Sequence, residues 1–323
     1  MAAGFTAMLQ ILTLTVPIYL IIALGFACVR VGVFTREQMG VLGQFLLRIS
    51  LPCLIFRAIS QYRLEEVLNP GYLSVYVSGS LLAWLGGFAY ARWHCRHGRS
   101  RSALYGQAMA ASNSVFIGYP IAQPLLGPAA DIALPLCLLT EVAIIIPLTM
   151  ALADAGENLR WQQSLLQSLR SLLKSPVFLA IAAGLGWSAT GIVLALPVQK
   201  TLTLLSSAAA PVALFMIGGM LVGQPLRGAG QDLGVLAAGK LLLHPLTVLL
   251  MLWLLPDFDP PLQTAALVFA CMPIPVLLPA LAQRYGLAGF CSAALVVATA
   301  LSFVSLNSWL AMAPWLMQWV QRH

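Results

Sequence analysis

Charged residues are scarce in this sequence, which excludes most classes of soluble protein. Only 8% of the 323 residues are Asp, Glu, Lys or Arg, and 60% are hydrophobic, whereas soluble domains carry about 25% charged residues. Apolar runs of roughly 20 residues, the length of a membrane-spanning helix, recur along nearly the whole chain. We therefore predict an all-α integral membrane protein with no room for a soluble domain.

Cysteine pairs and an amino-terminal basic segment are also missing. None of the six cysteines forms a C-x-x-C pair, which argues against a disulfide framework or a zinc site. His94, Cys95 and His97 lie in a basic loop whose spacing fits no zinc pattern, so we expect no metal. The first ten residues contain no Lys or Arg, unlike a secretory signal, and we interpret 8–29 as a retained first span.

The net charge of +7 comes mostly from short loops, which indicates membrane topology rather than a nucleic-acid partner. Lys and Arg of such loops collect on the cytoplasmic side. If both termini lie on the non-cytoplasmic side, that side holds only Arg57, Arg63, Lys200 and Arg322. The cytoplasmic loops then hold Arg30, Arg36, Arg92, Arg96, Arg99, Arg101, Arg160, Arg170, Lys174, Arg227 and Arg284. We predict this orientation.

About ten spans can be delimited. They are 8–29, 38–56, 71–91, 103–126, 130–152, 176–195, 199–222, 233–255, 261–283 and 288–312. The connection at 154–175 has leucines at helical spacing with basic residues opposite, which predicts an amphipathic helix at the cytoplasmic interface. An odd number of spans on either side of it gives the halves opposite orientations, so we predict two inverted five-helix repeats, 1–153 and 176–323.

Helix-breaking residues occupy corresponding spans of the two halves. The fourth span contains SNSVFIGYPIAQP (112–124) and the ninth contains CMPIPVLLPALAQRYG (271–286). Proline removes a hydrogen-bond donor and clashes with the carbonyl four residues earlier, so we expect the helices to break at Pro120 and at Pro273 and Pro275. A broken helix in a bilayer survives only where it is buried in protein or lines a wet cavity. A simple kink is the alternative, but two matching breaks favour a binding site, with predicted residues Asn113, Ser114, Gly118, Pro120, Pro273 and Pro275.

The polar residues of these spans leave several interpretations open. Asn113 can donate and accept hydrogen bonds, which suits a carboxylate ligand or a contact between helices. Arg48, which shares a helix face with Gln44, offers a guanidinium suited to a carboxylate. With Glu141, an acid deep in an apolar run, three hypotheses follow: Arg48 and Gln44 hold an anion, Arg48 pairs with Glu141, or Glu141 takes up a proton. For Lys240 we favour a side chain that snorkels to the interface.

Several motifs, taken in order along the chain, carry a family resemblance: LPCLIF (51–56), NSVFIGYP (113–120), APVALFMIGGML (210–221), HPL (244–246) and MPIPVLLPALAQRYG (272–286). Together they resemble the auxin efflux carrier family of secondary transporters, which includes bacterial malonate and malate permeases and plant PIN-like carriers.

The resemblance implies a fold similar to that of sodium/proton antiporters and bile acid symporters. Helices 4 and 9 would break and cross, with scaffold helices 1, 2, 6 and 7, and transport helices 3–5 and 8–10 moving against them like an elevator. The second crossing, MPIP, has no asparagine or acid beside it, so we expect most side-chain specificity to come from the first half. Arg48 also stands where the family leads us to expect an uncharged residue.

We therefore predict a secondary active transporter of small organic anions, such as malonate, malate or auxin-like acids, in the inner (plasma) membrane. One alternative is a cation/proton antiporter, which would need acids at the crossing, whereas none lies beside Asn113 or Pro273 in the sequence. The other is a sodium-coupled symporter of the bile acid type. An enzyme is not expected, because no span combines His with an acid.

Glu141 permits a coupling proton and free carbonyls permit sodium. We expect no other cofactor, and as partners the lipid bilayer, the anion and a second copy bound through the scaffold helices.

Overall fold

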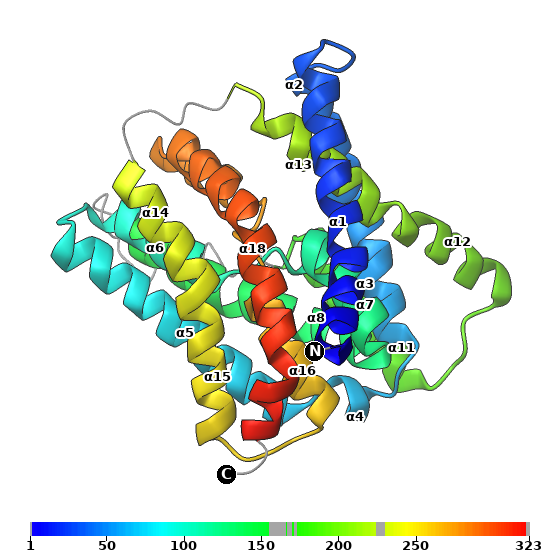
Figure 1. Cartoon of the computed structure of the whole chain (residues 1–323). Coiled ribbons are helices and arrows are strands. Elements are labelled where there is room, and N and C mark those ends of the chain that lie inside the picture. Colours follow the sequence, from blue (N-terminus) through cyan, green and yellow to red (C-terminus); the bar gives the residue numbers. More distant parts are fainter. Residues whose placement is uncertain (1, 155–165, 167–169, 171–172, 224–229, 321–323) are drawn as a thin grey trace.

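The computed structural model describes residues 2–154, 166, 170, 173–223 and 230–320, and within these ranges the regular structure is entirely helical (Figure 1). In the first half the helices are α1 (Ala2–Arg30), α2 (Arg36–Phe45), η1 (Leu46–Ser50), α3 (Leu51–Ser60), α4 (Leu64–Val67), α5 (Pro70–Ala89), η2 (Tyr90–His94), α6 (Arg99–Ala110), η3 (Ser114–Gly118), α7 (Tyr119–Leu126), α8 (Pro128–Thr140), η4 (Glu141–Ile145) and α9 (Ile146–Asp154). In the second half they are α11 (Pro176–Thr190), α12 (Leu196–Ser207), α13 (Ala209–Leu221), α14 (Gly230–Ala238), η5 (Gly239–Leu243), α15 (His244–Leu254), α16 (Pro260–Ala270), α17 (Leu278–Ala282), η6 (Gln283–Tyr285) and α18 (Ala288–Val320).

The all-α membrane architecture is confirmed. Within the described ranges, seven helical stretches are long and apolar enough to cross a membrane: Leu12–Arg30, Arg36–Ser60, Leu64–His94, Pro128–Asp154, Leu196–Leu221, Asp232–Leu254 and Ala288–Val320. Each coincides with a predicted span. The predicted span 176–195 corresponds to the shorter apolar helix α11, and the spans at 103–126 and 261–283 are interrupted. Most of the predicted amphipathic helix at 154–175 lies outside the described residues.

Local sequence signals explain where several helices begin. Thr35 caps α2 by accepting a hydrogen bond from the Gln38 N–H, and the Gln38 side chain accepts one from the Thr35 N–H. Asn69 caps α5 by accepting one hydrogen bond, from the Tyr72 N–H, on its side-chain oxygen. These oxygen acceptors satisfy N–H groups that a helix leaves unpaired in its first turn. Proline then occupies the first turn of α5, α8, α11, α12, α16 and α17, where its missing N–H costs little.

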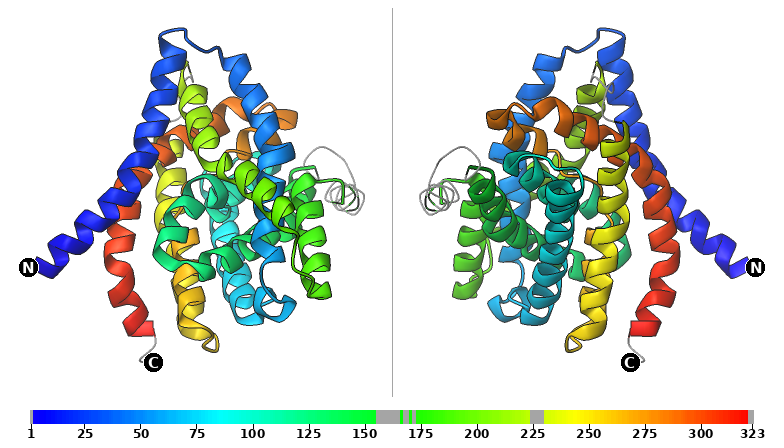
Figure 2. Two further views of the ribbon diagram at one scale, coloured as in Figure 1. Left: turned by 90° about the vertical axis from the view of Figure 1, so that its right-hand side faces the viewer. Right: turned by 90° about the vertical axis from the view of Figure 1, so that its left-hand side faces the viewer.

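The helices pack in two groups that lie on opposite sides of Figure 1. In one group α1 lies along α13, and α3 packs against α11 and α12. Glycines permit the α1–α13 contact, because a Cβ at Gly25 would lie 2.0 Å from the Phe215 carbonyl oxygen and one at Gly218 would lie 1.9 Å from that of Ile22. In the other group α5 packs against α6 and α15, and α14 against α18. Figure 2 shows α1 and α18 diverging toward the two chain termini.

Candidate functional site

The two interrupted spans meet inside the molecule. Helix α6 ends at Ala110, residues 111–113 are not helical, and η3 begins at Ser114. Helix α16 ends at Ala270, and residues 271–277 precede α17. The Asn113 N–H donates a hydrogen bond of 2.8 Å to the Pro273 carbonyl oxygen. The first break (residues 111–113) and the second break (residues 271–277) are therefore joined through their backbones.

The position of the first break corrects the sequence-based assignment to Pro120. Pro120 lies in the first turn of α7, which continues directly from η3, so the helix is not interrupted there. The break instead lies directly before η3 and ends at Asn113. The π-helical turn η3, whose hydrogen bonds run to the residue five positions earlier, accommodates the missing N–H of Pro120 without a break in the helix. Pro273 and Pro275 do lie within the second break, as predicted.

A pocket of about 80 Å³ lies between the two breaks. It is lined by Leu47, Leu51, Gln107, Ser112, Asn113, Ser114, Val115, Phe116, Leu138, Glu141, Val142, Ile146, Val177, Pro275, Val276, Leu277, Leu278 and Leu281. The Asn113 side chain is 3% exposed, and its Nδ2 makes no hydrogen bond to the described residues. A buried, unpaired amide donor costs free energy, so Nδ2 is suited to an acceptor that enters the pocket.

Backbone geometry reinforces this preference for an acceptor. Ser114, Val115 and Phe116 begin the helix that runs through η3 and α7, and all three line the pocket. The first N–H groups of a helix have no acceptor within it and carry the positive end of the helix dipole. Such an end binds anions. The pocket thus combines a helix amino terminus with the Asn113 donor.

Glu141 approaches the first break from η4. Its side chain is 6% exposed. Its Oε1 accepts hydrogen bonds from the Ser112 N–H at 2.7 Å and from the Ser114 hydroxyl at 3.4 Å. The sequence places no acid beside Asn113, but the tertiary structure does. The crossing therefore has an acid, contrary to the prediction from sequence, because η4 packs against a break that lies 29 positions earlier in the chain.

Lys240 approaches the same break from η5, and the interpretation that it snorkels to the interface is wrong. The side chain is fully buried, at 0% exposure. Its Nζ donates hydrogen bonds to the Ser112 hydroxyl at 2.6 Å and to the Ala270 carbonyl oxygen at 3.2 Å, and contacts His244 Nδ1. His244 Nε2 in turn contacts the Ser80 hydroxyl at 3.0 Å. Lys240 and His244 share a helix face one turn apart, the only sequence signal for this cluster.

The remaining predicted site residues divide between the pocket and other regions. Ser114 and Pro275 line the pocket. Gly118 is buried beside it, where a Cβ would lie 3.0 Å from the Phe269 ring, so the glycine allows η3 to approach α16. Gln44 and Arg48 are exposed and do not line the pocket. Among the described residues, Arg48 and Glu141 do not form an ion pair with each other.

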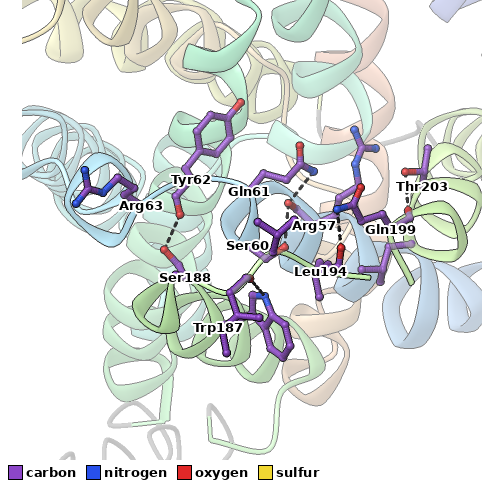
Figure 3. A pocket seen from close by; sticks show the side chains of 14 residues that line it. Arg57, Ser60, Gln61, Tyr62, Arg63, Trp187, Ser188, Leu194, Gln199 and Thr203 are labelled. Carbon is purple, nitrogen blue, oxygen red and sulfur yellow. Dashed lines mark hydrogen bonds between the residues drawn. The ribbon is translucent and has the colours of Figure 1, made fainter. Parts of the chain in front are cut away.

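A larger pocket of about 510 Å³ lies away from the breaks, between α3, α11 and α12 (Figure 3). It is lined by Arg57, Ser60, Gln61, Tyr62, Arg63, Trp187, Ser188, Gly191, Ile192, Val193, Leu194, Gln199, Leu202 and Thr203. Arg57 also lines a neighbouring pocket of about 290 Å³ together with Tyr119 and Pro120. Arg57 therefore lies between the larger pocket and α7, the helix that follows the first break.

Asp131 links these regions, and sequence reasoning did not single it out. The Tyr62 and Tyr119 hydroxyls donate hydrogen bonds of 2.8 Å and 2.6 Å to its two carboxylate oxygens. Burial raises the pKa of Tyr62, and the hydrogen bond to Asp131 raises it further. Tyr62 follows α3, whereas Tyr119 and Asp131 belong to α7 and α8. The carboxylate therefore connects the two helix groups on this side.

The basic loop forms a second polar cluster, at the opposite end of α5 from α4. Cys95, His97 and Asp232 place one ligand atom each within 4.8 Å of one another. Arg101 Nη2 already lies 2.7 Å from Asp232 Oδ2, and His97 Nε2 lies 3.3 Å from the same oxygen. The Arg101 guanidinium balances the carboxylate and repels a metal cation. This arrangement favours an ion pair within the described part of the loop cluster over a metal site.

Two comparisons relate this chain to known proteins. Residues 10–310 match the model of a family described as "Membrane transport protein". Over 303 residues the chain is 27% identical to a Rhizobium meliloti (strain 1021) protein named "Putative malonate transporter". The aligned region covers 93% of this chain and 95% of that protein. The match spans both breaks and confirms the resemblance found in the motifs. The chain therefore belongs to this family of membrane transport proteins, the auxin efflux carrier family.

Proposed function

We propose that the protein is a secondary active carrier of small carboxylates, with malonate and related dicarboxylates as the first candidates. The observation that carries this proposal is the buried, unpaired Asn113 Nδ2 at the amino end of η3, inside the pocket between the two breaks. A carboxylate supplies the acceptor that this donor lacks and the negative charge that the helix end favours. The named function of the Rhizobium meliloti relative agrees with this chemistry.

The helix packing supports an elevator motion. The group containing α1, α2, α3, α11, α12 and α13 corresponds to the proposed scaffold helices 1, 2, 6 and 7. The other group contains both breaks and corresponds to the transport helices. Within the proposed ten-helix plan of inverted repeats, such a division lets the broken helices carry the pocket across the membrane while the scaffold stays fixed.

The pocket's surroundings support an inward-facing state in the inner membrane with both termini outside. Leu278 and Leu281 line the pocket from α17, which leads to Arg284 in a proposed cytoplasmic loop. On the other side, the Tyr62 hydroxyl is bonded to Asp131, which holds the scaffold against α8. We therefore propose that the pocket opens toward the basic loops.

The test is uptake by the purified protein in proteoliposomes. A labelled panel of malonate, malate, indole-3-acetate and an amino acid is offered while proton, sodium and voltage gradients are imposed one at a time. We expect uptake of at least one carboxylate and no uptake of the amino acid. Empty liposomes are the control, and absence of carboxylate uptake under every gradient contradicts the proposal.

A further inference from the structure

Lys240 is a fully buried lysine that does not line the carboxylate pocket. Burying an ammonium within a membrane protein is costly unless its charge is balanced and its donors are paired. The structure meets both requirements. Lys240 is therefore an integral part of the crossing and not an interfacial lysine that only sets membrane topology.

The Lys240 ammonium has three N–H donors, and three acceptors surround it: Ser112 Oγ, Ala270 O and His244 Nδ1. Ala270 ends α16, so its carbonyl belongs to the negative end of that helix. Ser112 belongs to the first break. One ammonium therefore binds both interrupted spans at once.

Glu141 supplies the balancing charge through Ser112. The Ser112 N–H donates to Glu141 Oε1, while the Ser112 hydroxyl accepts from Lys240 Nζ. A carboxylate and an ammonium are thus held by the same unwound residue. The titratable groups near Lys240 are Glu141, Cys137, Cys271 and His244. Of these, only the Glu141 carboxylate supplies a full negative charge without the loss of a proton from a buried thiol.

Two of the three acceptors are oxygens of the kind that hard cations take from proteins, a hydroxyl and a carbonyl. They meet where two helices are interrupted, which is where carriers with broken helices bind coupling ions. We propose that Lys240 is the cation of this site: a tethered ammonium that occupies the position of a coupling sodium ion, so that carboxylate transport proceeds without sodium. This inference rests on the proposed carrier function.

The first test replaces Na⁺ by choline on both sides of the proteoliposomes during carboxylate uptake by the wild-type protein. We expect the rate to stay within about twofold, because the ammonium is already present. A strict sodium requirement overturns the tethered cation and leaves the carrier function intact. Absence of any carboxylate uptake refutes the carrier function instead, and the ion-binding test below then decides the role of Lys240.

The second test vacates the site with Lys240→Ala, using Lys200→Ala, an exposed lysine, as the matched control. We expect uptake by Lys240→Ala to fall by about tenfold or more. Millimolar Na⁺ or ethylammonium should then raise its unfolding temperature in detergent and restore part of the uptake. Neither cation should stabilise the wild type or Lys200→Ala.

Wild-type uptake by Lys240→Ala, or an unfolding temperature that neither cation changes, overturns the proposal. If Lys240→Ala is not recovered folded, Lys240→Ser keeps a hydroxyl in the vacated volume, and the same cation-dependent stabilisation decides the question.

Discussion

The two breaks are made of different chemical groups. The first presents side chains, with the Asn113 amide in the pocket and the Ser112 hydroxyl on Lys240. The second presents backbone, through the Pro273 carbonyl oxygen, next to the carbonyl oxygen of Ala270 at the end of α16. Backbone groups can fix geometry and charge but cannot vary with the residue, so the first break is the place where side chains distinguish one ligand from another.

The largest expected effect is a loss of stability when Glu141, the acid bonded to the first break, is removed. Glu141→Ala leaves the Lys240 charge buried without its partner, which should destabilise the protein by about 3–5 kcal/mol. The unfolding temperature in detergent measures this loss of stability. The double variant Glu141→Ala/Lys240→Met removes both charges and should recover much of the loss; a double variant less stable than Glu141→Ala would show that the two residues do not compensate each other.

The next effect concerns the unpaired donor of the first break. Asn113→Ala should lower the apparent affinity for carboxylate by about 10- to 100-fold, the value of a hydrogen bond to a charged group. The readout is the substrate concentration at half-maximal uptake. Gln44→Ala, which removes an exposed amide outside the pocket, is the control. Equal affinities in the two variants would place the anion elsewhere.

A smaller effect is expected at the second break. Pro273→Ala keeps the carbonyl that accepts from the Asn113 N–H, so uptake should change by no more than about threefold, because only the rigidity of the segment is altered. Uptake rate and affinity are measured together. A loss as large as that of Asn113→Ala would show that the proline ring itself is essential and would remove the contrast between the breaks.

The smallest effect is expected outside both breaks. Arg48 is exposed and does not line the pocket, so Arg48→Gln should leave uptake within about twofold of wild type, as for most surface substitutions. The measurement is uptake at low carboxylate concentration, where a lost anion contact is most visible. A strong loss would return Arg48 to the substrate path that the sequence suggested.

The broad plan of the molecule could be predicted from local sequence. Span positions follow from runs of apolar residues, and the seven membrane-length helices lie where those runs predict them. The second break also lies where Pro273 and Pro275 predict it. The first break lies at residues 111–113 rather than at Pro120, because the π-helical turn before Pro120 accommodates the missing N–H without ending the helix.

The polar network of the site depends on contacts that no local pattern contains. Ser112 and Lys240 are 128 positions apart, and their hydrogen bond exists because η5 packs beside the first break. Arg48 and Glu141 looked equally suited to an ion pair, yet Arg48 faces outward while Glu141 meets Ser112. Which way a helix is rotated about its axis depends on the whole set of its neighbours.

By itself the sequence determined the membrane class, the helix positions and the prediction that side-chain specificity comes from the first half. These follow from hydrophobicity and from Pro and Asn at particular positions, which act over a few residues. Tertiary structure alone decided that Lys240 is buried and that it shares Ser112 with Glu141. The physical reason is that a buried charge is stable only beside partners, and packing brings those partners from distant parts of the chain.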